Sequence, residues 1–212
     1  MDPGGYFIVR GTEKVILMQE QASKNRIFTF KNDKEIVSEV TCISAERKSR
    51  LLLTTNKRNQ VWIVLSIVLF FFSHIFFSNI QIVVKHNVFP KDGISVFVLF
   101  KAMCGLSDRD ITGLILRNLE PEEEKEYFKL LLPSIEHHVE LEINSEASAL
   151  QYIGTKITLS KDSNKPAMAL AYEVIYNSIL THIPVVNDCF YPKAMFLAFM
   201  VRRLLMAHMD PD

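Results

Sequence analysis

The chain has 212 residues, of which 49% are hydrophobic and 23% are charged, so it can bury at least one globular core and is not a disordered polypeptide. Its 24 basic and 24 acidic side chains balance, which argues against a free-standing protein that binds nucleic acid through a global basic field. Cys42, Cys104 and Cys189 lie far apart and lack metal-ligand spacing. We therefore expect reduced, mostly buried thiols of an intracellular protein, and the N-terminus lacks the pattern of a secretory signal.

The first half of the chain predicts short strands. Glycines at the start and at position 11 bound two β-rich runs, Tyr6–Arg10 and Lys14–Met18, which we expect to form a hairpin. Alternation of apolar and polar residues predicts three further strands at Arg26–Phe30, Ile36–Ile43 and Arg50–Thr55.

The second half predicts helices after an apolar segment, Ile94–Met103, that fits a strand followed by a helix. Proline and N-cap signals place the helices that follow. They are Asp110–Asn118 with Ser107 as N-cap, a helix that starts at Pro121 and stops at Pro133, a short helix to Tyr152 ended by Gly154, Pro166–Leu180, and Lys193–His208. The pattern therefore predicts an α+β (mixed) fold with a strand-rich N-terminal half and a helical C-terminal half.

Side chains that could carry chemistry have simpler structural explanations. The adjacent His137 and His138 point in different directions on a helix or strand, so we expect a solvated or half-buried pair. The acidic run Glu122–Glu126 fits the start of a helix, and Asp108 with Asp110 fits capping. Arg202 and Arg203 could contact phosphate or complement a helix dipole.

No known nucleotide-loop, zinc-protease or nucleophile-elbow motif is present in the sequence. We therefore predict no catalytic, cofactor-binding or metal-binding residue in this chain.

One segment does not fit a charged α+β chain. The 24 residues Val61–Val84 carry no formal charge and one ionisable side chain, His74. About 20 apolar residues are enough to cross a bilayer, so the run by itself is long enough to span a membrane. Trp62, the single tryptophan, lies inside the run, and we assign it no role.

Six groups of residues, in order along the chain, point to one family. They are DPGGYFIVRGTEKVILMQEQASKNRI (2–27), ERKSR (46–50), KHN followed by ISVFVLFKAMCGLSD (85–87 and 94–108), ALQYIGTK (149–156), ILTHIPV (179–185) and MVRRLL (200–205). By these segments the chain resembles the second-largest subunits of eukaryotic multisubunit RNA polymerases. The amino-acid sequence of residues 13–27 is most similar to the polymerase III version of this subunit.

The resemblance implies a domain organisation. Residues 1–25 would be the tail of the protrusion domain, 26–208 the lobe domain and 209–212 the truncated start of the fork region. The lobe is a mixed α/β domain on one side of the DNA cleft, where it also docks accessory subunits. In this family residues 156–165 are a strongly basic, glycine-rich loop, whereas KITLSKDSNK in this chain is only weakly basic.

The resemblance also implies a function for the whole assembly: a nuclear, DNA-directed RNA polymerase III that transcribes small RNAs. Its partners would be the largest subunit, lobe-docking accessory subunits and DNA, with no genuine membrane partner. The catalytic magnesium would be held by the largest subunit, so this chain would be part of a nucleotidyltransferase without active-site residues of its own.

Residues 61–81 interrupt the resemblance, because joining Gln60 to Ile82 restores the family spacing. We interpret these 21 residues as a translated, unspliced intron of 63 nucleotides. A lineage-specific insertion and a true membrane span are the alternatives. A span would separate two strands of one sheet by about 30 Å instead of about 4.8 Å.

Two other classes of protein stay open beside the polymerase interpretation. One is a single-pass membrane protein with a soluble α/β head, and the other is a stand-alone soluble interaction domain.

Overall fold

The computed structural model describes residues 4–32, 35–45, 47–57, 80–157 and 165–209. Their main sheet is antiparallel, and its strands follow in sequence order. The strands are β3 (Ile27–Lys31), β4 (Ile36–Ile43), β5 (Lys48–Lys57), β6 (Ile80–Lys85) and β7 (Ile94–Ser95). The helices are α1 (Val96–Cys104), α2 (Asp108–Ile115), α3 (Pro121–Glu140), α4 (Glu146–Lys156), α5 (Ala167–Asn177) and α6 (Tyr191–Met209). The predicted α+β class is confirmed.

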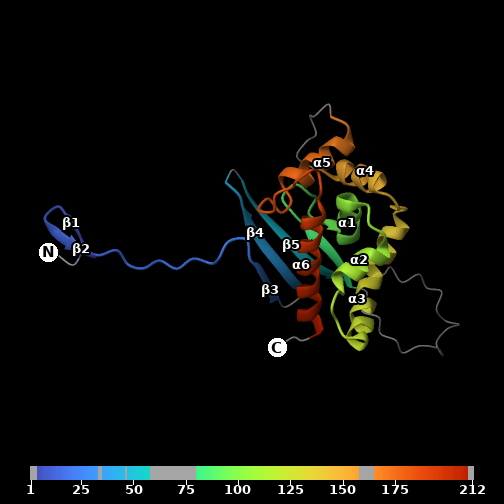
Figure 1. Ribbon diagram of the computed structural model, residues 1–212, viewed down its shortest axis with the longest axis horizontal. Coiled ribbons are helices and arrows are strands. Elements are labelled where there is room, and N and C mark those ends of the chain that lie inside the picture. Colours follow the sequence, from blue (N-terminus) through green and yellow to red (C-terminus); the bar gives the residue numbers. More distant parts are fainter. Residues whose placement is uncertain (1–3, 33–34, 46, 58–79, 158–164, 210–212) are drawn as a thin grey trace.

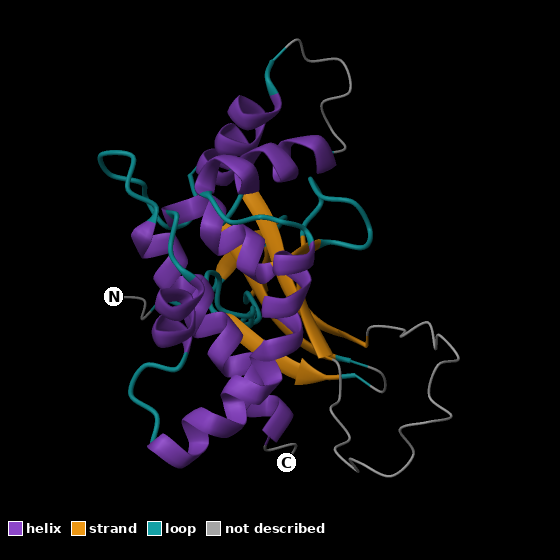
Figure 2. Cartoon of the chain, turned by 90° about the vertical axis from the view of Figure 1, so that its right-hand side faces the viewer, coloured by secondary structure: helices purple, strands orange, loops and turns teal. Residues whose placement is uncertain are grey.

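The helices cover one face of this sheet and leave much of the other face open (Figures 1 and 2). Alternation along β4 and β5 separates the two faces: Val40, Cys42, Leu51 and Leu53 point to the helix side and are fully buried. Helix α6 packs over β4, and each such apolar side chain contributes about 1.5–3 kcal/mol when fully buried. The main core therefore lies between the sheet and the helices.

The N-terminal hairpin lies at the end of an extended arm, apart from the body (Figure 1). It pairs β1 (Phe7–Val9) with β2 (Thr12–Lys14), so the predicted second strand at Lys14–Met18 is wrong. The reason is the two-residue turn at Arg10 and Gly11, where both φ angles are positive, at 54° and 75°. Such a turn sets Val9 directly opposite Thr12 and ends the pairing at Lys14.

Pro133 does not stop its helix, because α3 continues to Glu140. A proline removes one helical hydrogen bond, which favours an end but does not force one. Here the tertiary contacts hold the helix on both sides of the proline: Leu131 is fully buried, and the Ser134 hydroxyl accepts a hydrogen bond of 2.9 Å from the backbone N–H of Ile82 in β6.

Gly154 does not end α4, which extends to Lys156. A Cβ atom at this position would collide with the backbone of Ala167 at the start of α5. The glycine therefore allows the backbones of α4 and α5 to approach closely. Gly154 marks the place where these two helices meet and not the end of α4.

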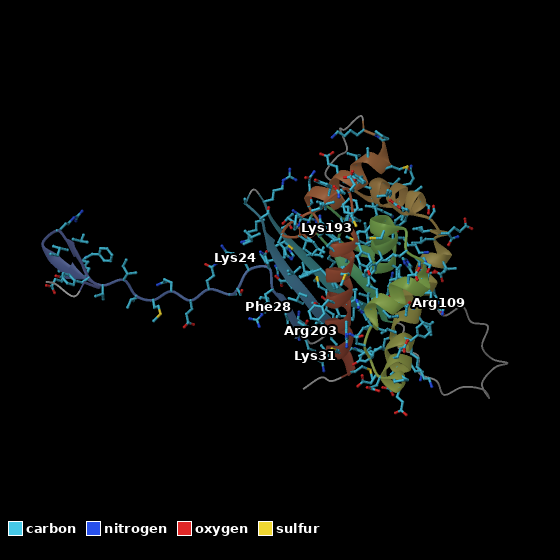
Figure 3. The ribbon with its side chains drawn as sticks, in the orientation of Figure 1. Lys24, Phe28, Lys31, Arg109, Lys193 and Arg203 are labelled. Atoms are coloured by element: carbon cyan, nitrogen blue, oxygen red, sulfur yellow. The ribbon has the colours of Figure 1, made fainter. Side chains whose placement is uncertain are left out.

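Lys193 in the first turn of α6 is buried, with 1% of its surface exposed (Figure 3). Its Nζ donates to the carbonyl oxygens of Ile175, Tyr176 and Ile179 at 2.7–2.9 Å, at the C-terminal end of α5. Burial lowers the pKa of Lys193 to about 8, so the amine still carries its proton at neutral pH. This cation closes the end of α5, where unpaired carbonyl groups favour positive charge.

Strands β5 and β6 pair in register from Leu52↔Lys85 to Lys57↔Ile80. Residues 58–79 lie outside the described residues, as does most of the predicted insert 61–81, but Gln81 is part of β6 and is buried. Nowhere in the described ranges is a helix long and apolar enough to cross a membrane. The weakly basic segment at 158–164 and residues 210–212 also lie outside the described residues.

Replacing Gly154 with alanine should destabilise the chain by about 1–3 kcal/mol, because the added methyl overpacks the contact with Ala167. The matched control is Gly113→Ala in α2, where the added Cβ meets no atom within 4 Å, so the change should be neutral or stabilise by up to about 1 kcal/mol. Urea unfolding midpoints measure both. Equal effects at the two positions would contradict the close α4–α5 contact.

A variant without residues 61–81 should keep the sheet. The Thr55↔Ile82 pair would then be closed by residues 56–60, a five-residue loop of ordinary hairpin length. We expect cooperative thermal unfolding by circular dichroism with no loss of strand signal. Deleting residues 61–84 is the control, because it also removes the buried Ile82 and Val84 and should abolish cooperative unfolding. A variant lacking 61–81 that behaves like this control would show that the segment is needed for folding.

Candidate functional site

Ser107, Asp108 and Asp110 lie at the N-cap and in the first turn of α2, as the sequence predicts, but Asp108 also contacts two other helices. Ser107 caps α2, since its hydroxyl accepts from the backbone N–H of Asp110 at 3.2 Å. The carboxylate of Asp108 turns inward instead, and its Oδ1 lies 3.0 Å from both Lys101 Nζ and His138 Nε2. This triad joins α1, α2 and α3.

The triad is part of the packing of the body. Lys101 is 5% exposed and His138 is fully buried, so the prediction of a solvated or half-buried histidine pair is wrong for His138, whereas His137 is half-buried. The His138 ring stacks on Phe97 with 5.6 Å between ring centroids. Burial lowers the pKa of His138, and Asp108 opposes that shift. Such buried polar groups tie helices together when each has a partner.

The remaining polar residues singled out in the sequence lie apart from one another. Glu122–Glu124 are exposed in the first turn of α3. Arg202 donates to the carbonyl oxygen of Arg117 at 2.6 Å, just beyond α2, and Arg203 lies over the ring of Phe199. Across the described ranges, no three His, Cys, Asp or Glu side chains gather as a metal-binding group.

The thiols differ in their surroundings. Cys42 is buried and Cys104 is half-buried, and burial raises the pKa of each to about 11. Cys189 is exposed, which the expectation of mostly buried cysteines did not foresee. Thiols with raised pKa values are poor nucleophiles at neutral pH, so neither Cys42 nor Cys104 fits a catalytic role.

The face of the sheet that points away from the helices, here called the open sheet face, collects basic and aromatic side chains. It carries Phe28 and Phe30 of β3, Glu39 of β4, Lys48 and Arg50 of β5, and Lys85 of β6, with Lys24 and Lys91 beside it. Lys24 and Phe28 lie on this side of the molecule (Figure 3). Strand alternation explains the collection, since these strand positions are out of phase with those that point to the helices. Val37, Thr54 and Val83 share this phase but are buried.

Two adjoining hollows shape the open sheet face. One, of about 620 Å³, is lined by basic side chains that include Lys48, Arg50 and Lys91, with no carboxylate in its lining. The other, of about 500 Å³, is lined by Lys24, Phe28, Phe30 and Glu39 among others, and the two hollows share Lys48. These residues form no local sequence motif, because they are spread over 68 positions and meet only in the folded sheet.

His86 lines the larger hollow and is 7% exposed. Its Nδ1 accepts from the backbone N–H of Val88 at 3.3 Å, so the ring proton is on Nε2. Nε2 has no acceptor among the described residues. Burial lowers the pKa of His86 to about 4, so the ring is a neutral hydrogen-bond donor at physiological pH.

The arm presents an exposed apolar surface. Val15, Ile16, Leu17 and Met18 are 68–93% exposed, and Phe7 and Ile8 in the hairpin are also exposed. Contiguous exposed apolar side chains of this kind usually mark a contact with further protein. The body is anchored just after the arm, where Asn25 exchanges hydrogen bonds with the backbone of Ile43.

Comparison with known proteins gives one family. The model of RNA polymerase Rpb2, domain 2, matches residues 14–212. The DNA-directed RNA polymerase III subunits RPC2 of Schizosaccharomyces pombe and Saccharomyces cerevisiae are 37% and 32% identical to the chain over its whole length. The DNA-directed RNA polymerase subunit Rpo2N of Methanocaldococcus jannaschii is 27% identical over 96% of the chain and 36% of that protein.

The chain spans 16% of the length of each of the two yeast relatives. The family match covers the sheet, all the helices described above and the end of the arm. The chain therefore belongs to the family of RNA polymerase Rpb2, domain 2.

Proposed function

We propose that this chain works as part of the second-largest subunit of a nuclear DNA-directed RNA polymerase, most like polymerase III, in the transcription of small RNAs. The observation that carries the proposal is the family match over residues 14–212, with polymerase III subunits at 37% and 32% identity along the whole chain. Phosphoryl transfer by the complete enzyme would use magnesium held by the largest subunit. This chain contributes structure and contact surface.

The arm and the body would belong to two domains of that subunit. Residues 1–25 would complete the protrusion domain, which would cover the exposed apolar side chains at 15–18, and 26–208 would form the lobe. The anchor at Asn25, where the arm meets the sheet, supports this boundary. Residues 209–212 would begin the fork region.

In the assembled polymerase the lobe would form one side of the DNA cleft and dock accessory subunits. The open sheet face and the exposed aromatic and methionine side chains of α6, such as Phe199 and Met206, have the chemistry that such contacts use. No membrane partner is part of this proposal.

The single-pass membrane alternative has less support. The last five residues of the apolar run, Ile80–Val84, belong to β6, which is the hydrogen-bonded neighbour of β5, with Lys57 opposite Ile80. Lys57 and Ile80, the residues on either side of 58–79, therefore lie next to each other in the sheet. We propose that residues 61–81 are a translated intron, and sequencing of spliced messenger RNA across Gln60 and Ile82 tests it: a main transcript that retains all 63 nucleotides refutes it.

A chimeric subunit tests the polymerase function. In S. pombe, the aligned segment of RPC2 would be replaced by this chain with and without residues 61–81. We expect the chimera without these residues to co-purify with the largest polymerase III subunit and to support RNA synthesis. The control chimera carries Leu51→Asp, which puts a charge in the fully buried core and should not assemble. A folded chimera that fails to co-purify contradicts the proposed function.

A further inference from the structure

We propose that the open sheet face binds single-stranded nucleic acid, with bases stacked on Phe28 and Phe30 and phosphates held by the surrounding lysines. The inference deepens the proposed function and rests on it, because transcription opens a duplex and so supplies single strands. It adds a ligand class and named contact residues on a surface that faces away from the core.

The two phenylalanines are placed as a stacking platform requires. Phe28 and Phe30 are two residues apart on β3, so both project from the same face. They are 44% and 40% exposed and lie on the edge strand of an antiparallel sheet. Aromatic side chains on the open face of a sheet stack on unpaired bases, and this recognition tolerates any base because every base has a π-face.

The charges around the rings favour a polyanion. Arg50 forms an ion pair with Glu39, and Lys85 lies 3.5 Å from Glu35, so these two cations are partly neutralised. Lys24, Lys48 and Lys91 have no acidic partner among the described residues. The chain as a whole has no net charge, so the positive character of this face is local.

The shape of the surface connects the two kinds of contact. Lys48 is shared by the hollow that holds the phenylalanines and by the larger basic hollow, so a strand could run from one to the other.

Two other polyanions fit less of the surface. Duplex DNA presents its phosphates, but the faces of its bases are stacked inside the helix. It would therefore contact the lysines but could not stack a base on the phenylalanines. An acidic peptide would likewise use the lysines but offers no flat ring system to stack on both phenylalanines. The exposed aromatic pair therefore favours single strands.

Fluorescence anisotropy with a 15-residue oligothymidylate tests the proposal, using the 212-residue chain fused to maltose-binding protein. Phe28→Ala with Phe30→Ala should raise the Kd by about tenfold or more, as expected for the loss of base stacking. Phe28→Tyr keeps the ring and should retain binding. Phe128→Ala is the matched control, because Phe128 is equally exposed but lies on α3.

A second pair of variants tests the phosphate contacts. Lys48→Ala with Lys91→Ala should weaken binding and lower the slope of log Kd against log salt concentration by about 1.4, or about 0.7 for each lost phosphate contact. The control is Lys125→Ala with Lys129→Ala on the exposed side of α3, which should change neither quantity. Circular dichroism melting checks that every variant is folded.

Three outcomes overturn the proposal. The first is no binding of the oligothymidylate, and the second is an unchanged Kd for the double phenylalanine variant. The third is a DNA duplex or a poly-glutamate peptide that binds as tightly as the oligothymidylate and loses the same affinity in each variant. Each of these outcomes is separable from failure of the polymerase function. A chimera that assembles with the largest subunit while the chain fails to bind oligothymidylate disproves the platform alone.

Discussion

The antiparallel pairing of β5 with β6 is the contact on which the rest of the body depends. It joins two strands separated by residues 58–79 and places Leu53 opposite Val84, both fully buried. β6 then leads into β7 and α1, whose side chains fill the centre of the core. If this pairing slipped by one residue, the buried Ile82 and Val84 would move from the helix side to the open sheet face, so the register is held by the burial itself.

Polar contacts between the helices hold them in specific orientations. Lys101, Asp108 and His138 tie α1, α2 and α3 together, and Lys193 ties the start of α6 to the end of α5. An apolar core alone tolerates small rotations of a helix, whereas a buried ammonium group that loses its acceptors bears a large desolvation cost. These contacts therefore restrict which helix arrangements are compatible with the core.

The same alternation that builds the core also produces the open sheet face. Every second residue of β3, β4 and β5 must point away from the helices, and in this chain those positions include Phe28, Phe30, Lys48 and Arg50. The body thus has a stable interior and a separate polar and aromatic face, on which the proposed contacts would lie. This division suits a chain that belongs to a family of polymerase domains and is proposed to act through contact surfaces rather than through catalytic residues.

Local signals determined much of this fold, because capping, alternation and turn chemistry act over a few residues. Ser107 as an N-cap, Pro121 at a helix start and the alternation in β4 were all readable from the sequence, and the ordered family segments identified the polymerase family. Tertiary structure decided the rest. Gly154 looked like a helix end and Pro133 like a stop, but contacts with Ala167 and β6 outweighed the local preference.

The open sheet face is the clearest case of a feature that the sequence alone did not show. Lys24, Phe28, Lys48 and Lys91 carry no common motif, and pairing of distant strands brings them to one surface. The sequence by itself determined the family, the class of fold and most helix starts. Only the tertiary structure decided which polar residues are buried and which surface they leave exposed, because both depend on contacts between residues that are far apart along the chain.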